Sequence, residues 1–406
     1  MSRGAIPFIL ITLALDAMGI GLILPVMPGL IREVTGGDLA QAALWGGILA
    51  TTFAVMQFLF GPVLGNLSDR FGRRPVLLTS LAIMAADYVV MAVAGSLWLL
   101  FAGRIVGGIT AGTQSTAMAF IADVSTPEEK SARFGLVGAA FGAGFVAGPL
   151  LGGLLAELGT RAPFWAAAGL AAANLALGAA VLPETVTDRI RRRFEWRRAN
   201  PFGAFASMGR LPGVRTLLLL FFLYDFAFIV YPATWAYFGP AAFGWSPATV
   251  GVSLAAFGIA MALVQGGLIR IALSRLGERG TILFGFVFNA AAFLVLALLT
   301  SGTLALIFTP VTALGAVVTP ALQGRMSRIA PDDQQGELQG AITSVRAVAA
   351  IFSPLVMTAV FAAFTTPPGP HLPGAAFLLS SALMLACIVL WTAGPRRVIP
   401  ASEDPA

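Results

Sequence analysis

The sequence is poor in the residues that form covalent cross-links, metal sites and charged surfaces. Its 406 residues include one cysteine, Cys387, and one histidine, His371. These counts exclude an internal disulfide and a metal site built from cysteine and histidine. Only 11% of the residues are charged, whereas ordinary soluble domains carry roughly 25%. So few charges could not cover the surface of a soluble protein of this length, which indicates a membrane protein.

Several other classes of protein lack their usual signatures here. No Gly-x-x-x-x-Gly-Lys-Ser/Thr loop occurs, so ATP hydrolysis by that route is excluded. No nucleophile–base pair stands out, and we expect neither an enzyme nor a bound cofactor. The net charge of +6 is attributed to loop anchors, so nucleic acid is not an expected partner. Met1–Gly4 lead directly into a long apolar run without a cleavage site, which predicts a retained first helix.

Long apolar runs divide the chain into segments that could cross a bilayer. Runs of about 20 residues have the length of a spanning helix. Helices are favoured because lipid offers no partner for an open sheet edge. We count twelve runs, at residues 5–30, 41–66, 75–95, 97–123, 133–157, 162–183, 214–238, 247–272, 280–300, 303–327, 336–364 and 372–394. The sequence therefore predicts an all-α membrane protein with twelve transmembrane helices.

The positive charges test this count. Of the 25 lysines and arginines, Arg32 and Arg161 fall in loops assigned outside, and Arg104 and Arg346 fall within spans. All the others belong to loops and tails assigned to the cytoplasm or to the span ends that adjoin them, and basic residues of short loops are retained on that side. A missed span would scramble this asymmetry. We therefore expect both termini in the cytoplasm.

A short charged turn, Gly65–Arg74, connects the second and third runs. A charge at the membrane centre costs about 2.5–3.5 kcal/mol even on a lenient insertion scale, so this turn must lie at a membrane face. Arg70, Arg73 and Arg74 assign it to the cytoplasmic face. One loop thus predicts both the class of protein and its orientation.

The longest hydrophilic stretch divides the chain into two halves. It predicts a six-helix bundle at 1–183, a cytoplasmic linker at 184–213, a second bundle at 214–395 and a cytoplasmic tail at 396–406. The linker combines Phe194 and Trp196 with six arginines: Arg189, Arg191, Arg192, Arg193, Arg197 and Arg198. Two interpretations stay open, an amphipathic segment that binds anionic lipid and a positively charged connector.

A shift of 205 residues superposes the two halves. Ser68–Arg74 then falls on Leu273–Arg279, and three residues recur: Arg70, Gly72 and Arg74 as Arg275, Gly277 and Arg279. The acidic stretch Pro127–Glu129 recurs as Pro331–Asp333 at a shift of 204. Duplicated halves are a common plan of secondary transporters. We therefore predict two pseudo-symmetric bundles.

Three motifs resemble one known family. The Gly65–Arg74 turn resembles the signature loop of the major facilitator superfamily, and Arg104–Gly108 resembles its helix-four arginine motif. Gly144–Gly153 is similar to the helix-five motif of its drug/proton antiporters. Further stretches look like the tetracycline/proton antiporters, namely Leu15–Pro25, Ser68–Ser80, Ala86–Tyr88, Phe243–Trp245 and Pro320–Gly324. The resemblance implies the major facilitator fold, proton-driven drug export and a bacterial inner membrane.

The chain departs from that group in its second half. Members of the group typically carry a histidine on helix eight and an aspartate on helix nine, both tied to proton coupling and drug handling. The matching residues here are Val264 and Asn289, which do not titrate near neutral pH. In exchange, helix seven carries Asp225 and helix eleven carries Arg346, where the family pattern has uncharged residues. Coupling in this half is therefore expected to be arranged differently.

Five ionisable residues lie within the predicted spans. Asp16, Asp87 and Asp225 are candidates for proton coupling, and Arg104 and Arg346 are candidate charge partners. Such residues are functional candidates because their cost of insertion must be offset. Burial disfavours the charged form of Asp16, which could then load and release a proton; a structural hydrogen bond is the alternative. Asp87 is either a switchable proton site or half of a fixed pair with Arg104. Asp225 and Arg346 could form an equivalent pair, for coupling or for structure.

The resemblance implies a gating role for the charged turn. In the family this turn latches the cytoplasmic ends of the two halves, which assigns the role to Gly65, Asp69, Arg70, Gly72, Arg73 and Arg74. We expect Asp69 to cap the following helix or to interact with its positive N-terminus. We expect Arg73 to bridge to Asp123 on helix four. A solvated loop that only sets topology is the alternative.

The helix-five motif removes side-chain bulk from one helix face. Small residues let helices approach closely. The face is formed by Gly144, Gly148, Pro149, Gly152 and Gly153. We expect it to pack against a second-half helix and to seal a leak, with generic glycine packing as the alternative.

Polar and aromatic residues within the spans are the candidates for substrate binding. A few polar groups can orient a flat ligand in a mostly apolar pocket. The candidates are Gln57, Gln114, Tyr224, Tyr231, Trp235, Gln265, Asn289 and Gln323. Each of the aromatic residues could equally belong to the core.

Together these features predict a monomeric antiporter that exports an amphipathic drug in exchange for a proton. A tetracycline carried as a magnesium chelate is the cargo that the resemblance implies, and membrane lipid is a further expected partner. A broader multidrug exporter, a proton-coupled nutrient symporter and a non-transporting receptor are the alternatives. The helix-five motif argues against the symporter.

Overall fold

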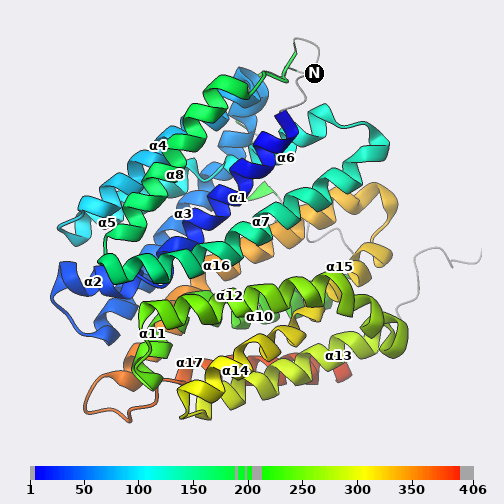
Figure 1. Ribbon diagram of the computed structural model, residues 1–406. Coiled ribbons are helices and arrows are strands. Elements are labelled where there is room, and N and C mark those ends of the chain that lie inside the picture. Colours follow the sequence, from blue (N-terminus) through cyan, green and yellow to red (C-terminus); the bar gives the residue numbers. More distant parts are fainter. Residues whose placement is uncertain (1–4, 188–190, 197–198, 204–212, 394–406) are drawn as a thin grey trace, which may run out of the picture. The chain divides into compact units, whose positions relative to one another are not determined.

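The computed structural model describes residues 5–187, 191–196, 199–203 and 213–393 (Figure 1). Within these ranges every regular element is a helix and no strand occurs, which confirms the predicted all-α class. The described residues fall into two compact units. The first comprises residues up to Pro201 together with Trp245–Ala255, and the second comprises Phe202–Gly244 and the residues from Ala256 onward.

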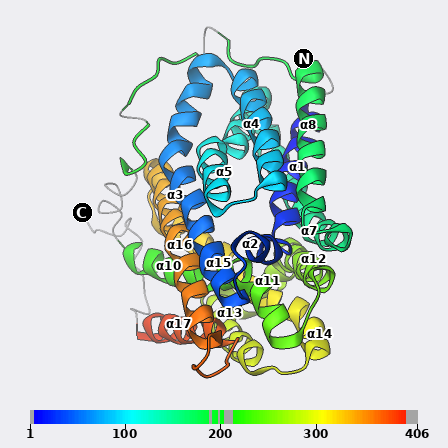
Figure 2. The same ribbon diagram turned by 90° about the vertical axis from the view of Figure 1, so that its left-hand side faces the viewer.

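The first unit contains helices α1–α8 (Figure 2). Asp38 and Ser96 begin two of them, because their side-chain oxygens accept hydrogen bonds from the backbone N–H groups three residues later, at 2.8 and 3.3 Å. Their bounds are α1 (Ala5–Ile23), α2 (Met27–Thr35), α3 (Leu39–Phe71), α4 (Arg73–Val93), α5 (Leu97–Thr110), α6 (Thr113–Val124), α7 (Pro127–Leu155) and α8 (Ala162–Val181).

The remaining helices, apart from the start of α12, belong to the second unit. Their bounds are α10 (Arg215–Phe228), α11 (Val230–Phe243), α12 (Pro247–Leu263), a π-helix (Val264–Leu268), α13 (Ile269–Leu298), α14 (Gly302–Thr312), a 3₁₀ turn (Ala313–Val317), α15 (Val318–Ile329), α16 (Gln335–Thr365) and α17 (Ala375–Ala393). The core of this unit is aromatic. Tyr231 and Trp235 on α11 pack against Phe377 on α17, with ring centroids 5.8 and 5.9 Å apart.

Eleven helical stretches in the described part of the chain are long and apolar enough to cross a membrane. One of them, Pro247–Leu298, has 52 residues. A helix rises 1.5 Å per residue, so this stretch is more than twice as long as the roughly 30 Å hydrocarbon core. Gly277 interrupts it with φ +64° and ψ 175°, and α12 and α13 double back there (Figure 1). It therefore holds two spans, and the total of twelve agrees with the prediction.

The repeat predicted from the sequence recurs in the ends of the helices. α1 ends at Ile23 and α10 ends 205 residues later at Phe228, just as α6 ends at Val124 and α15 at Ile329. Ser96 and Ser301 both cap helices through their side chains, and Gly72 and Gly277 both have positive φ. Both fourth spans also break at the same register, before Thr113 and before Val318. The two halves thus share these helix boundaries.

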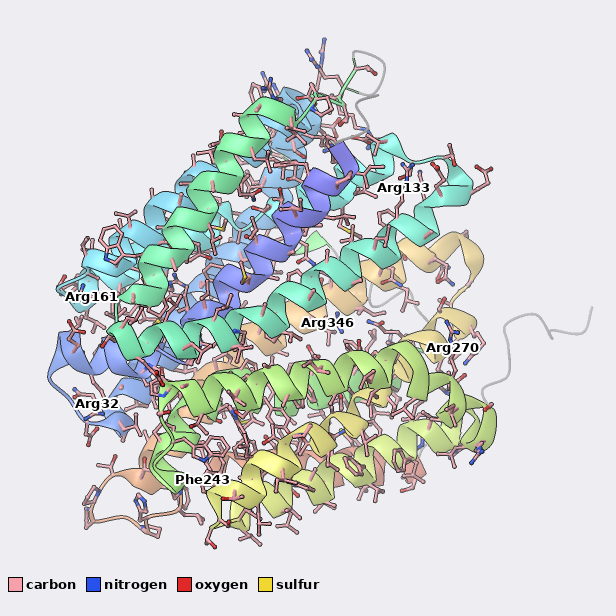
Figure 3. All side chains as sticks on the ribbon, viewed as in Figure 1. Arg32, Arg133, Arg161, Phe243, Arg270 and Arg346 are labelled. Atoms are coloured by element: carbon pink, nitrogen blue, oxygen red, sulfur yellow. The ribbon has the colours of Figure 1, made fainter. Side chains whose placement is uncertain are left out.

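Basic residues mark the two ends of the first unit. Figure 3 shows Arg133, at the start of α7, at the opposite end from Arg161, at the start of α8. Arg161 donates hydrogen bonds to the carbonyl oxygens of Ala92 and Ala94, both at 2.7 Å, and its Nε lies 3.0 Å from Glu33. A single arginine therefore ties the ends of α2 and α4 to α8.

Three of the four glycines of the helix-five motif pack against the backbone of α1, and not against a second-half helix as we expected. A Cβ added at Gly144, Gly148 or Gly152 would meet the carbonyl oxygen of Ala14, Met18 or Leu22, respectively. Both series advance by four residues, so the two helices run in parallel and touch once per turn. Gly153 instead faces Pro247 and Ala248, in the Trp245–Ala255 segment that clusters with this unit. Close backbone approach of this kind requires small residues.

We predict that Gly148→Ala destabilises the protein and that Gly142→Ala does not. The new Cβ at Gly148 would lie 2.5 Å from the Met18 carbonyl oxygen, whereas nothing lies within 4 Å of the same position at Gly142. Overpacking typically costs about 1–3 kcal/mol. Thermal unfolding of the purified protein in detergent should show a lower midpoint for Gly148→Ala alone. Equal midpoints for the two variants would contradict the close packing of α1 and α7.

Candidate functional site

An ion pair between α4 and α5 lies within the spans of the first unit. Arg104 Nη2 donates to Asp87 Oδ2 at 3.2 Å, and the two side chains are 15% and 5% exposed. The structure thus forms the pair that the sequence suggested. Asp87 Oδ1 and Arg104 Nε are buried and have no hydrogen-bond partner among the described residues. A carboxylate with one open oxygen can accept a proton without first breaking another contact.

Two glycines on α5 make room for this carboxylate. A Cβ at Gly103 would lie 2.6 Å from Asp87 Oδ1, and one at Gly107 would lie 2.9 Å from Oδ2. The Arg104 guanidinium also lies over the ring of Phe53 on α3, 5.5 Å from its centroid. The ring face favours the cation. Three helices therefore position the pair. Gly103 and Gly107 flank Arg104 because a larger side chain at either position would collide with Asp87, which the sequence motif alone did not reveal.

Asp16 on α1 belongs to the same region. Tyr88, which follows Asp87 on α4, is 4% exposed, and its hydroxyl lies against Gly19, one turn beyond Asp16. In the described part of the chain, no hydrogen bond or ion pair ties Asp16 to a cation. Tyr88 is the residue that sequence reasoning missed here, although its motif had been noted for family resemblance.

The second unit carries a looser pair. Arg346 Nε on α16 lies 4.0 Å from Asp225 Oδ2 on α10, with side chains 46% and 20% exposed. The Arg346 guanidinium is 5.2 Å from the centroid of Phe221. The longer distance and greater exposure imply weaker mutual attraction than in the first unit. These two residues can separate at smaller cost than Asp87 and Arg104.

Asn289, which stands where the resemblance expects an aspartate, has a clear structural partner. It is fully buried, and its Nδ2 donates to the carbonyl oxygens of Gly285 at 2.8 Å and Gly315 at 3.0 Å. The Tyr224 hydroxyl also donates to Gly315, at 3.3 Å. Gly315 belongs to the 3₁₀ turn that breaks the tenth span. Asn289 therefore links α13 to the 3₁₀ turn through the Gly315 carbonyl.

Val264, which stands where the resemblance expects a histidine, begins a π-helix that includes Gln265. π-helical turns often occur at functional sites. The other substrate candidates differ in exposure. Gln57, Gln114 and Gln265 are exposed and Gln323 is half-buried, whereas Tyr231 and Trp235 lie within the aromatic core. A ligand could reach those two rings only if the core repacked.

The charged turn is a network centred on Arg73, which is 9% exposed. Its Nη1 donates to Asp69 and to Ser68, both at 2.6 Å, and its Nε donates to Asp123 at 3.1 Å. The expected bridge from Arg73 to Asp123 is thus formed. It ties the end of α3 and the start of α4 to the end of α6.

The residue that caps α4 is Glu184, not Asp69 as we expected. Its two carboxylate oxygens accept from the backbone N–H groups of Arg73 at 2.9 Å and Arg74 at 3.2 Å. Asp69 is instead engaged by the Arg73 side chain. The turn fits only with glycine at position 72, because its φ is +112° and a Cβ there would collide with the Glu184 carboxylate. The expected cap is wrong because Glu184, which lies more than a hundred residues away in the sequence, takes that place. The other expected role of Asp69, an interaction with the positive N-terminus of α4, stays a prediction.

The second unit has an equivalent network with its charges reversed. Glu278 accepts from Arg325 at 3.2 Å and also pairs with Arg328. Glu278 and Arg328 stand 205 residues after Arg73 and Asp123. The repeat therefore preserves an ion pair between the same two helix ends while exchanging the acid and the base.

Comparison with known proteins identifies the family. The profile of the Major Facilitator Superfamily matches residues 9–354. The tetracycline resistance protein of class C from Escherichia coli is 42% identical over 95% of this chain and 96% of its own length. The class G protein from Vibrio anguillarum is 42% identical over 87% of this chain and 89% of its own.

Solved structures agree with this result. A human organic anion transporter is 26% identical, with a TM-score of 0.67 over 96% of this chain and 99% of its own. The nucleoside transporter NupG shares the fold, with a TM-score of 0.77 at 14% identity over 97% of this chain and 99% of its own. The chain therefore belongs to the Major Facilitator Superfamily, in the family that includes the tetracycline resistance proteins.

Proposed function

We propose that this protein exports a tetracycline across the bacterial inner membrane in exchange for protons, by alternating access. The drug class is supported by relatives that are named tetracycline resistance proteins, at 42% identity over most of the chain. The observation that carries the coupling is Asp87, which is 7% exposed, pairs with Arg104 through one oxygen and has its other oxygen unpaired among the described residues.

The chemistry of the pair follows from its burial. While Asp87 is ionised, it compensates the permanent charge of Arg104. A proton added to Oδ1 neutralises the carboxyl group and leaves Arg104 as an uncompensated buried cation, which is strongly unfavourable. Rearrangement of α4 and α5 relieves this strain. Protonation is thereby converted into a change of conformation.

The transport cycle uses the same groups for cargo. In the outward-facing state, protons reach Asp16 or Asp87 and displace a cationic cargo, a tetracycline chelated to magnesium. After the protein reopens inward, release of the protons restores an anionic site for the next molecule. Asp16, which has no cation partner among the described residues, supplies the second carboxylate. All of these groups come from one chain, so a monomer suffices.

We assign both termini to the cytoplasm. The arginines of the charged turn and Arg133 belong to loops that connect even-numbered spans to the next span, and such basic loops are retained inside. Arg161 lies at the opposite end of the first unit from Arg133 (Figure 3). In the second unit we assign a coupling role to Asp225, which takes the place of the missing family residues.

The Arg73 network is proposed as a latch that stabilises one conformational state. Asp69, Arg73 and Asp123 join three helix ends in the first unit, and Glu278 with Arg328 joins the equivalent ends in the second. Breaking a largely buried pair by removing one partner costs about 3–5 kcal/mol. Such a change shifts a two-state equilibrium by more than about 100-fold.

Removal of the titratable carboxyl groups is expected to abolish transport. The double variant Asp16→Asn, Asp87→Asn should reduce proton-driven tetracycline uptake into everted vesicles to the level of vesicles without the protein. The reason is that an amide side chain neither binds nor releases a proton at physiological pH. The control is Asp38→Asn, since asparagine caps a helix as well as aspartate does. Full uptake by the double variant, or uptake that persists after the pH gradient collapses, would exclude this mechanism.

The substrate range is tested by drug susceptibility. In a host without other efflux pumps, the protein should raise resistance to tetracyclines and leave resistance to unrelated amphipathic drugs unchanged. Asp16→Asn should return the host to sensitivity. Resistance that rises across the panel would instead indicate a multidrug exporter. Alkalinisation of the medium on addition of substrate would indicate a symporter.

If the Arg73 network acts as a latch, exchanging its acids and its base should be tolerated only when all three residues are changed together. Arg73→Glu alone should strongly reduce transport, because Glu would face two carboxylates, Asp69 and Asp123. The triple variant Asp69→Ser, Arg73→Glu, Asp123→Arg copies the residues at the equivalent second-unit positions, namely Ser274, Glu278 and Arg328. It should recover most of the lost transport in the same vesicle assay. A triple variant no better than Arg73→Glu would show that the turn does not act through this charge network.

A further inference from the structure

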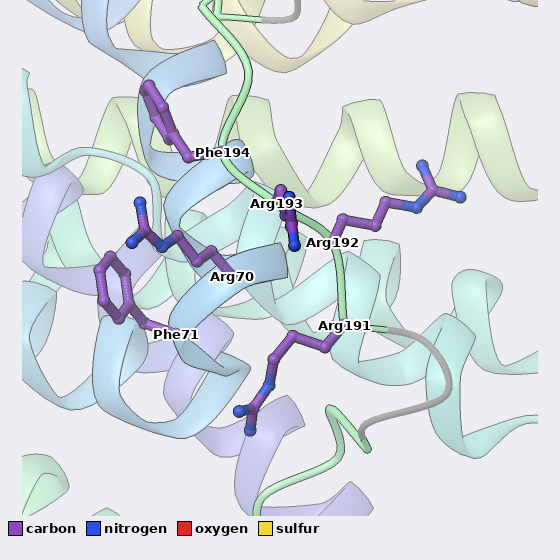
Figure 4. Close-up of a pocket in the computed structure, with 6 residues that line it drawn as sticks. All are labelled: Arg70, Phe71, Arg191, Arg192, Arg193 and Phe194. Carbon is purple, nitrogen blue, oxygen red and sulfur yellow. The ribbon is translucent and has the colours of Figure 1, made fainter.

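A basic cavity lies where the linker crosses the end of α3. It has a volume of about 600 Å³ and is lined by Arg70, Phe71, Arg191, Arg192, Arg193 and Phe194 (Figure 4). Four of these six residues are arginines and none is acidic. All of them belong to the first unit. Neither the transport cycle nor the latch uses this cavity.

The cavity is built by specific contacts of the linker backbone. Asn66 on α3, which is buried, donates through Nδ2 to the carbonyl oxygen of Glu195 at 2.8 Å. The backbone N–H of Arg192 donates to the carbonyl oxygen of Asp69 at 3.2 Å. Residues 129 and 123 positions apart are therefore joined at two points. These bonds hold the backbone of the linker beside the end of α3 before any ligand arrives.

Three of the four cavity arginines lack an acidic partner in the described ranges. Among the residues that the structure describes, no carboxylate forms an ion pair with Arg70, Arg192 or Arg193. The Arg70 guanidinium lies over the Phe71 ring, 5.0 Å from its centroid. Arg192 and Arg193 are exposed. Figure 4 shows the guanidinium groups of the lining arginines extending in different directions around the linker. Each is suited to a phosphate, whose oxygens accept paired N–H donors.

Aromatic residues beside the arginines point to a lipid rather than a soluble anion. Phe71 is 56% exposed and Trp196 is 78% exposed, and Trp196 packs edge-on against Phe194 at 5.1 Å. Phe71 is the last residue of a spanning helix. Aromatic side chains at the ends of spans lie at the level of the lipid headgroups, and arginine clusters next to spans attract anionic lipids.

We propose that this cavity binds the headgroup of an anionic phospholipid. The arginines contact the headgroup phosphate, and Phe71 and Trp196 lie among the adjacent headgroups and upper acyl chains. The bound headgroup bridges α3 and the linker and so adds to the two backbone hydrogen bonds that join them. This proposal concerns binding and does not depend on which substrate the protein exports.

The test compares lipids on the purified full-length protein in detergent. Retention of phosphatidylglycerol and of phosphatidylcholine is measured by native mass spectrometry for the wild type, for Arg192→Gln with Arg193→Gln, and for Arg270→Gln with Arg275→Gln. The last variant removes the same charge from exposed positions outside the cavity. We expect the wild type and the control to prefer phosphatidylglycerol, and the cavity variant to lose most of that preference.

Three results would overturn the proposal. The cavity variant could retain phosphatidylglycerol as the wild type does, or the control could lose as much as the cavity variant, which would indicate general charge attraction. Inorganic phosphate at millimolar concentration could displace the lipid completely, which would indicate a site for a soluble anion. Arg192→Lys with Arg193→Lys keeps the charge and should retain phosphatidylglycerol, and its elution on size exclusion verifies that substitutions here leave the protein folded.

Discussion

The hydrocarbon core of the membrane cannot solvate a charge, and this constraint governs the placement of every ionisable residue within the spans. Asp87 and Arg104 satisfy one another across α4 and α5, while Gly103, Gly107 and the Phe53 ring provide a place of the right size and polarity. The compensation is incomplete, since one carboxylate oxygen and one guanidinium nitrogen keep no hydrogen-bond partner among the described residues. Most of the charge of this ion pair is compensated, so the pair can lie within the membrane. The unpaired carboxylate oxygen can still accept a proton.

The same constraint explains why charge clusters gather at helix ends. Arg73 joins three helix termini in the first unit, and its backbone N–H is itself capped by Glu184. At a helix end the side chains are partly wetted and the open backbone groups need partners. An ion network there can therefore be broken and formed again at moderate cost. This is the property that a conformational latch requires.

In the duplicated architecture, the features that recur in both halves are those that the fold requires, whereas the charges differ between the halves. Helix ends, capping serines and the break in the fourth span recur at a constant shift of 205 residues, because two bundles of one topology need the same boundaries. The charges do not recur in this way. The Arg73–Asp123 pair becomes Glu278–Arg328, and the tight pair of Asp87 and Arg104 has only a looser analogue in Asp225 and Arg346. An ion pair needs opposite charges at two positions, and it forms equally well whichever of the two positions carries the acid.

The sequence by itself determined the spans, the charged turn, the repeat and the list of intramembrane charges. Each of these depends on local length, polarity or spacing, which the order of residues states directly. Only the tertiary structure decided that Glu184 caps α4, that Tyr88 lies against Gly19 one turn beyond Asp16, that Gly103 makes room for Asp87, and that Asn289 donates to Gly315. These contacts depend on how each helix is rotated about its axis. Helices that are apolar on all sides carry no stripe of polar residues that would reveal this rotation.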